Sequence, residues 1–162
     1  MGRNHTFWDS EFENNKYNES DHGEFQRNLL FVAMPFIEAM DDVFQAIEEE
    51  AFKFQLNTIR VDKIPGSSLV LKRITKAIEN AEFLIFDLTN ERPNVYYEPG
   101  YAHDIGNEGD EILLIAKEGT TIHFDLEPLK ITYYDSIEDL KSNVYYQLMQ
   151  IIRISRNKES NY

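Results

Sequence analysis

Residues 82–88, which read Glu-Phe-Leu-Ile-Phe-Asp-Leu, form the most strand-like run in the chain. Apolar side chains stand next to one another in this run instead of alternating with polar ones. A strand of this kind is typical of the centre of a parallel sheet, where helices cover both faces. The run therefore predicts a parallel sheet with a helical layer on each side.

Shorter apolar runs and helical patterns alternate on both sides of that central run. On residues 38–54, apolar side chains recur at spacings of three and four, which predicts a helix with one face on the sheet. Alternating strands and helices favour parallel pairing with right-handed crossovers. We therefore expect an α/β fold, a three-layer doubly wound (flavodoxin-like) sheet of five mostly parallel strands. The expected strands are residues 29–34, 57–62, 82–88, 111–116 and 130–134, and the expected helices are residues 38–54, 69–80, 97–105 and 136–154.

Composition divides the chain into three parts. Residues 1–26 are polar and acidic without sustained periodicity, so we expect an arm that is partly ordered or, equally well, a mobile tail. Its scattered aromatic side chains could dock on the domain, on a neighbouring subunit or on a protein partner. Residues 27–156 are expected to form one folded domain, followed by a tail at residues 157–162. The aromatic residues of the arm are Phe7, Trp8, Phe12 and Tyr17.

Composition and charge also exclude several classes of function. Without cysteine, the chain has neither a disulfide framework nor a thiolate for metal or redox chemistry. The formal net charge of −13 argues against extended binding of a nucleic-acid backbone, which uses clustered basic side chains. His123 and Asp125 have no partners at metal-ligand spacing, so we expect no metal and no cofactor. No apolar run reaches the roughly 18 to 20 residues of a transmembrane helix, and the N-terminus lacks a signal-peptide core, so we expect a cytoplasmic location and no membrane contact.

Three loops are the places where a ligand is expected. Doubly wound sheets bind ligands outside the carboxyl ends of their strands, near the point where the strand order reverses. The loops after the first three expected strands meet this rule. Their candidate binding residues are Met34, Pro35 and Phe36 in the first loop, Asp62, Gly66 and Ser67 in the second, and Thr89, Asn94, Tyr97, Gly100 and Tyr101 in the third. Arg60, Lys63 and Arg92 could hold a phosphate there, or be ordinary surface charges.

Two acidic residues of the third loop region are the candidates for chemistry. Asp87 is the polar exception in the apolar strand, and a buried carboxylate there is costly unless it is hydrogen-bonded or emerges into a polar site. Glu98 lies at the expected start of a helix, with Pro99 in its first turn. The simpler alternatives are that Asp87 caps the following loop through the amides of Thr89 and Asn90, and that Glu98 is a plain helix-start acid.

Three segments together resemble the nucleoside 2-deoxyribosyltransferase-like superfamily, and more narrowly its TIR-like nucleotide-binding branch. They are residues 31–36 (FVAMPF), 87–89 (DLT) and 93–103 (PNVYYEPGYAH). The resemblance implies a flavodoxin-like fold and cleavage of an N-glycosidic bond. It aligns Glu98 with the nucleophile of the transferases and Asp87 with an aspartate that helps to bind or protonate the base. The chain departs from the pattern at Pro99, where the family usually has leucine, and in the acidic segment 107–111.

The implied chemistry agrees with elementary principles. Breaking a C1′–N bond develops oxocarbenium character on the sugar, which a carboxylate stabilises or captures, as in retaining glycosidases. A second carboxyl group with a raised pKa can protonate the departing base. Asp87 and Glu98 are eleven positions apart, and a strand–loop–helix turn can bring both to one cleft.

Three functions remain open from the sequence. The first is an enzyme, hydrolase or transferase, acting on a nucleoside, a nucleotide or an NAD-like molecule. The second is a module that senses a nucleotide without chemistry, or a component of a larger assembly, and the third is a protein-interaction domain. Members of the resembling family commonly complete their sites between subunits, so we also expect a homo-oligomer, with Tyr145 and Tyr146 as possible contacts.

Overall fold

The computed structural model describes residues 24–35, 37–60, 68–89, 111–122 and 130–161. In the helix at residues 68–80, the structure describes the backbone throughout and the side chains from Ile74 onward. The elements in chain order are β1 (Gln26–Ala33), the 3-10 turn η1 (Glu38–Met40), α2 (Asp41–Phe52), β2 (Asn57–Arg60), α3 (Ser68–Asn80), β3 (Ala81–Asp87), β4 (Ile112–Lys117), β5 (Ile131–Tyr134) and α5 (Ile137–Glu159).

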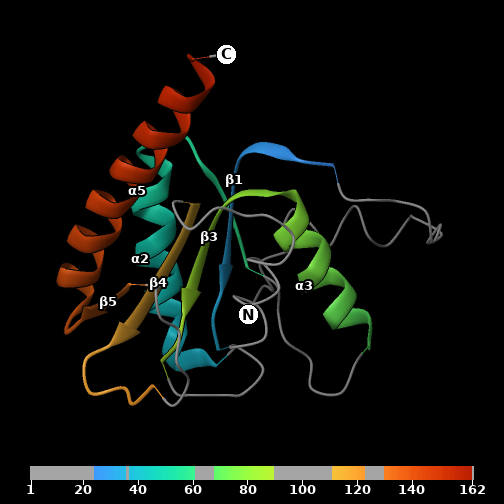
Figure 1. The fold of residues 1–162 in the computed structure, drawn as a ribbon. Coiled ribbons are helices and arrows are strands. Elements are labelled where there is room, and N and C mark those ends of the chain that lie inside the picture. Colours follow the sequence, from blue (N-terminus) through green and yellow to red (C-terminus); the bar gives the residue numbers. More distant parts are fainter. Residues whose placement is uncertain (1–23, 36, 61–67, 90–110, 123–129, 162) are drawn as a thin grey trace.

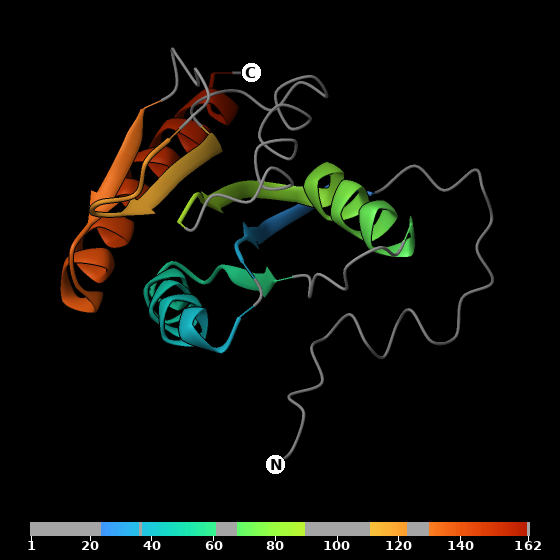
Figure 2. The ribbon, with the colours of Figure 1, turned by 90° about the horizontal axis from the view of Figure 1, so that it is seen from below.

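The described strands form one five-stranded sheet in the order β2-β1-β3-β4-β5. All four strand pairings are parallel, so the expectation of a mostly parallel sheet is confirmed in its stricter form. The helices α2 and α5 lie side by side on one face, and α3 lies on the other (Figures 1 and 2). This is a three-layer, doubly wound, flavodoxin-like fold.

Alternation along the strands divides the core into two parts. On β1, Leu30 and Val32 pack with the residues of α2 and α5, whereas Leu29 and Phe31 pack with those of α3. The same alternation holds on β3 and β4. Every residue of β3 is buried, as the apolar run predicted for a central strand.

Several element boundaries differ from those expected. The first helical pattern is divided into η1 and α2, and β1 begins at Gln26. That early start includes an irregularity, because Asn28 adopts a left-handed conformation with φ 65° between two registers of pairing with β3. The expected helix 97–105 and residues 1–23 of the expected arm 1–26 lie outside the described residues, and Gln26, the last residue of that arm, belongs to β1.

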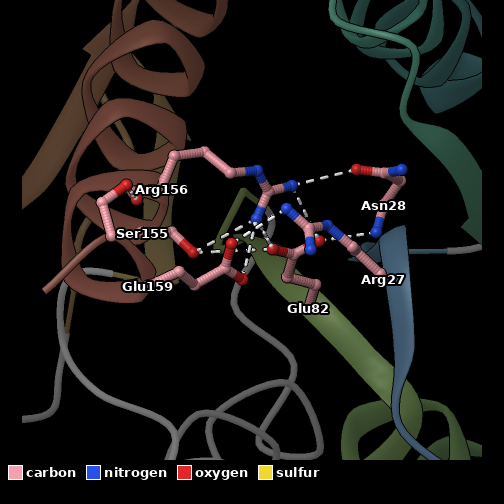
Figure 3. A network of polar contacts seen from close by, with 7 residues as sticks. Arg27, Asn28, Glu82, Ser155, Arg156 and Glu159 are labelled. Carbon is pink, nitrogen blue, oxygen red and sulfur yellow. Dashed lines mark hydrogen bonds and ion pairs between the residues drawn. The ribbon is translucent and has the colours of Figure 1, made fainter. Parts of the chain in front are cut away.

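The last helix is longer than the pattern predicted. It begins after Ser136, whose hydroxyl oxygen accepts the backbone N–H of Asp139 at 3.1 Å, an N-cap. It continues to Glu159, beyond the expected end at residue 154 and into the expected tail. Within this extension, Arg156 binds the buried Glu82 of β3 (Figure 3). A tertiary contact therefore extends a helix whose apolar pattern ends earlier.

Candidate functional site

The carboxyl ends of β1 and β3 lie next to each other, with Ala33 paired to Phe86. From β1 the chain crosses to β2 on one side, and after α3 it returns to β3 on the other, so the strand order reverses between β1 and β3. This is the switch point where such folds bind ligands. Met34, Pro35, Asp87 and Thr89 all stand at this edge, directly after or at the end of these two strands.

Asp87 ends β3 with no exposed surface. Its Oδ1 accepts the backbone N–H of Thr89 at 2.9 Å, and its Oδ2 accepts the hydroxyl of Tyr134 at 2.9 Å. The bond from the Thr89 amide is the loop-capping contact that the simpler sequence interpretation expected. The other amide of that interpretation, on Asn90, lies outside the described residues.

Thr89 and Tyr134 extend this contact across three strand ends. The two hydroxyl oxygens are 3.3 Å apart, and the Oγ1 of Thr89 accepts the backbone N–H of Lys117 at 2.9 Å. The carboxyl ends of the strands β3, β4 and β5 are thereby joined by hydrogen bonds between polar groups. We call Asp87, Thr89 and Tyr134 the carboxyl-edge triad.

Burial controls the electrostatics of the triad. Removal of the Asp87 carboxyl from water raises its pKa above the ordinary value, and the hydrogen bonds from Thr89 and Tyr134 oppose that rise without cancelling it. Burial, together with the nearby Asp87 charge, also raises the pKa of the Tyr134 phenol. Tyr134 is therefore a neutral hydroxyl at ordinary pH, and Asp87 retains its proton to a higher pH than an exposed aspartate.

The residues that follow β1 at this edge are apolar, and contacts with neighbouring residues fix their positions. Met34 and Pro35 are buried, and the carbonyl of Pro35 accepts the N–H of Ile37 at 3.1 Å. The Sδ of Met34 accepts an N–H of Arg60 at 3.8 Å. Pro35 itself has no N–H to offer to a ligand.

Arg60, at the end of β2, is not an ordinary surface charge. Its side chain is only 14% exposed and pairs with Asp41 at 3.0 Å. The guanidinium lies 4.7 Å from the centre of the Phe44 ring, within cation–π range. Contacts with other side chains of the same chain therefore hold this arginine beside the switch point.

The amino end of α2 carries its own negative charges. Asp41 and Asp42 are in its first turn, and Glu38 is in the preceding η1. These carboxylates satisfy the positive end of the helix dipole. The β1–α2 loop is therefore unlike a glycine-rich loop that leaves a helix start open to phosphate.

Many of the expected site residues lie outside the described residues. The structure brings Met34, Pro35, Asp87 and Thr89 to one edge of the sheet. The expected site residues outside the described ranges are Phe36, Asp62, Gly66, Ser67, Asn94, Tyr97, Glu98, Gly100 and Tyr101.

Sequence reasoning missed Tyr134 as a member of this site. The signal was available in part, because Tyr134 ends the last expected strand and the carboxyl ends of parallel strands share an edge. Its partner could not be identified, since 47 positions separate it from Asp87.

A cavity of about 230 Å³ lies elsewhere, between α5 and the strands β4 and β5. Most of its lining is apolar, and of the three amide side chains that also line it, two are already engaged with β5. Asn143 donates to the carbonyl of Tyr133, and Gln147 donates to the hydroxyl of Thr132, each at 3.3 Å. The cavity does not include the triad, so we do not assign the chemistry to it.

Among the comparisons with known proteins, the solved structures bear on the fold. No protein family matches the sequence, and no curated protein matches it. Among solved structures, three variants of a flavo di-iron protein from Thermotoga maritima superpose with TM-scores of 0.57, 0.60 and 0.59. Each is 11% identical, and the alignments cover 80% of this chain but only 37 to 38% of that protein. The similarity concerns the architecture alone, and the chain has a flavodoxin-like α/β fold.

Proposed function

We propose that the protein binds a nucleoside, a nucleotide or an NAD-like molecule at the carboxyl edge between β1 and β3 and cleaves its N-glycosidic bond. The observation that carries the proposal is the buried carboxyl group of Asp87 at the switch point. A carboxyl group in an apolar strand costs several kcal/mol unless it has partners, and here the triad supplies them. The resemblance of residues 31–36, 87–89 and 93–103 to the deoxyribosyltransferase-like superfamily supports the same assignment.

In the proposed reaction, Glu98 is the nucleophile. Its carboxylate attacks C1′ as the C1′–N bond breaks, and the electron pair of that bond leaves with the base. The resulting glycosyl ester is then cleaved by water, which gives a hydrolase, or by a second base, which gives a transferase. Asp87 binds the departing base or supplies its proton, a role that fits its raised pKa. Nicotinamide leaves from a cationic pyridinium, so an NAD-like substrate needs no such proton.

The test is direct measurement of base release. The protein is incubated with NAD and with a panel of ribo- and deoxyribonucleosides and their phosphates, and free base or nicotinamide is separated and quantified. We expect release by the wild type, loss of about a hundredfold or more in Glu98→Gln, and little change in the control variant Glu91→Gln, which removes a nearby acidic charge in the sequence. Light scattering at the assay concentration reports the oligomeric state. Absence of any free base or nicotinamide in every oligomeric state would contradict the proposal.

A second function, nucleotide sensing without catalysis, is favoured by one specific observation. Both oxygens of Asp87 are already engaged with Thr89 and Tyr134, and the side chain has no exposed surface. A carboxyl group in this state can serve to hold the edge of the sheet rather than to react. Calorimetry that finds tight nucleotide binding with no turnover would support the sensing function. Absence of both binding and turnover, with a stable protein partner, would support an interaction domain.

A further inference from the structure

The hydroxyl of Tyr134 has two partners at hydrogen-bond distance. It donates to the Oδ2 of Asp87 at 2.9 Å, and it lies 3.3 Å from the Oγ1 of Thr89. Between the Tyr134 and Thr89 oxygens, either atom can be the donor. A rotation about the C–O bond of Tyr134 therefore changes the direction of one proton without moving a heavy atom.

Besides the two hydroxyl groups of Thr89 and Tyr134, two backbone amides donate to this cluster. The amide of Thr89 points at the Oδ1 of Asp87, and the amide of Lys117 points at the Oγ1 of Thr89. An ionised Asp87 therefore accepts from Thr89 and from Tyr134. When Oδ2 carries a proton, it can donate to the Tyr134 oxygen if Tyr134 turns its own proton towards Thr89.

We propose that Tyr134 is a positioning residue whose reversible hydroxyl keeps the buried Asp87 carboxyl hydrogen-bonded both with and without a proton. Without Tyr134, the Oδ2 of Asp87 loses its hydrogen-bond partner at 2.9 Å, and a buried polar atom that loses its partner is costly in an apolar interior. With Tyr134, Asp87 can release and regain a proton at a fixed position. Tyr134 acts through Asp87 and does not itself touch the reacting atoms.

No charged side chain competes with Tyr134 for Asp87 among the described neighbours. Asp87 pairs with Ile115 on β4, and the preceding Phe86 pairs with Ala33 on β1. Lys117 contributes its backbone amide, while its side chain is exposed. The described groups that hydrogen-bond to Asp87 are therefore Thr89 and Tyr134, and both oppose the rise in its pKa that burial causes.

The meaning of this inference for catalysis rests on the proposed function. A neutral purine or pyrimidine needs a proton as it leaves, and Asp87 must then change its protonation state during the reaction. A pyridinium leaving group makes no such demand. Tyr134 is therefore expected to affect the cleavage of nucleosides with neutral bases more than the cleavage of NAD.

The first test follows protonation directly and needs no substrate. Carbon-13 NMR of the intact protein records the Asp87 carboxyl and the phenolic carbon of Tyr134 against pH. In the wild type, the Tyr134 carbon is expected to change at the same midpoint as Asp87, whereas the carbon of the exposed Tyr133 does not. In Tyr134→Phe, the Asp87 midpoint is expected to rise by on the order of one pH unit, because the carboxylate loses a donor, and Tyr133→Phe leaves it unchanged. A Tyr134 carbon that ignores the titration, or an Asp87 that keeps one state until unfolding, overturns the inference.

The second test separates this inference from the proposed function. We expect Tyr134→Phe to lower kcat/KM for neutral-base nucleosides by about tenfold or more and to change NAD cleavage by less than about twofold. Equal effects on both substrate types overturn the positioning role. A wild type with no turnover but with coupled NMR titrations contradicts the proposed function and supports the coupling of Tyr134 to Asp87. Normal turnover with uncoupled titrations contradicts the inference alone.

Discussion

The carboxylate of Glu82 and the guanidinium of Arg156 form an ion pair at the amino edge of the sheet, 74 positions apart in the chain. Glu82 is only 4% exposed, and its second oxygen also accepts the backbone N–H of Asn28 at 2.5 Å. Arg156 in turn donates to the Oδ1 of Asn28 at 3.0 Å. Figure 3 shows these side chains converging from β1, β3 and α5. This edge lies opposite the candidate site, so the network has a structural role.

Replacement of Arg156 by alanine is expected to destabilise the protein by about 2 to 3 kcal/mol. The variant leaves the buried Glu82 carboxylate with the backbone N–H of Asn28 and the more distant hydroxyl of Ser155 as donors. The partial exposure of Arg156 keeps the loss below that of a fully buried pair. Urea unfolding at neutral pH measures the change. Arg153→Ala, on an exposed position of the same helix, should cost less than about 0.5 kcal/mol. Equal losses for the two variants would refute the role of the ion pair.

Stability should fall in acid partly because of Glu82. Burial alone would raise the pKa of this carboxyl, but the hydrogen bonds from Arg156 and Asn28 outweigh it and lower the pKa below the ordinary 4.5. A lowered folded-state pKa stabilises the protein above the unfolded-state value, and this stabilisation is lost as pH falls through the folded-state value. Unfolding free energies measured from neutral pH downward should therefore decline below pH 4.5. Glu82→Gln should flatten this decline, and an unchanged slope would count against the assignment.

The same substitution at two left-handed positions should have opposite effects. Asn28 and Gln55 have φ values of 65° and 59°, a left-handed conformation that glycine adopts without steric cost and that asparagine tolerates better than glutamine. Gln55 is exposed just after α2 and shows no side-chain hydrogen bond among the described residues, so Gln55→Gly should stabilise by about 0.5 to 1 kcal/mol. Asn28→Gly removes the contact to Arg156 and should destabilise by about 1 kcal/mol. Thermal unfolding of both variants measures the two signs, and a shared sign would show that strain or contact alone decides.

Two neighbouring residues of α5 provide a test of how this helix faces the core. Leu148 is fully buried, whereas Met149 is 38% exposed. Leu148→Ala should therefore cost about 3 kcal/mol through lost burial and a residual cavity, and Met149→Ala less than about 1 kcal/mol. Chemical denaturation of both variants measures the difference. Comparable losses would mean that the helix is rotated about its axis.

The layers of the fold could be predicted from the sequence because each signal for them is local. The apolar run at residues 82–88 requires burial on both faces, and the spacing on residues 38–54 places one helical face on the sheet. The end of α5 could not be predicted in this way. It depends on Arg156 reaching Glu82, a contact that leaves no periodic signal in the sequence.

The candidate site was predictable only in its location. The rule for parallel sheets placed Met34, Asp87 and Thr89 at one edge, and the structure confirms that placement. The contribution of Tyr134 required knowledge of which strand ends lie within reach of a hydroxyl. The roles of Glu98 and of the other residues outside the described ranges stay predictions.

The attachment of Arg156 has a consequence for motion. The last turn of a helix usually frays, because its carbonyl groups have no partners within the helix. In α5 such fraying would separate the guanidinium of Arg156 from the buried carboxylate of Glu82. Backbone amides near this terminus should therefore resist hydrogen exchange nearly as long as the central strands do, and should open with the whole domain rather than on their own.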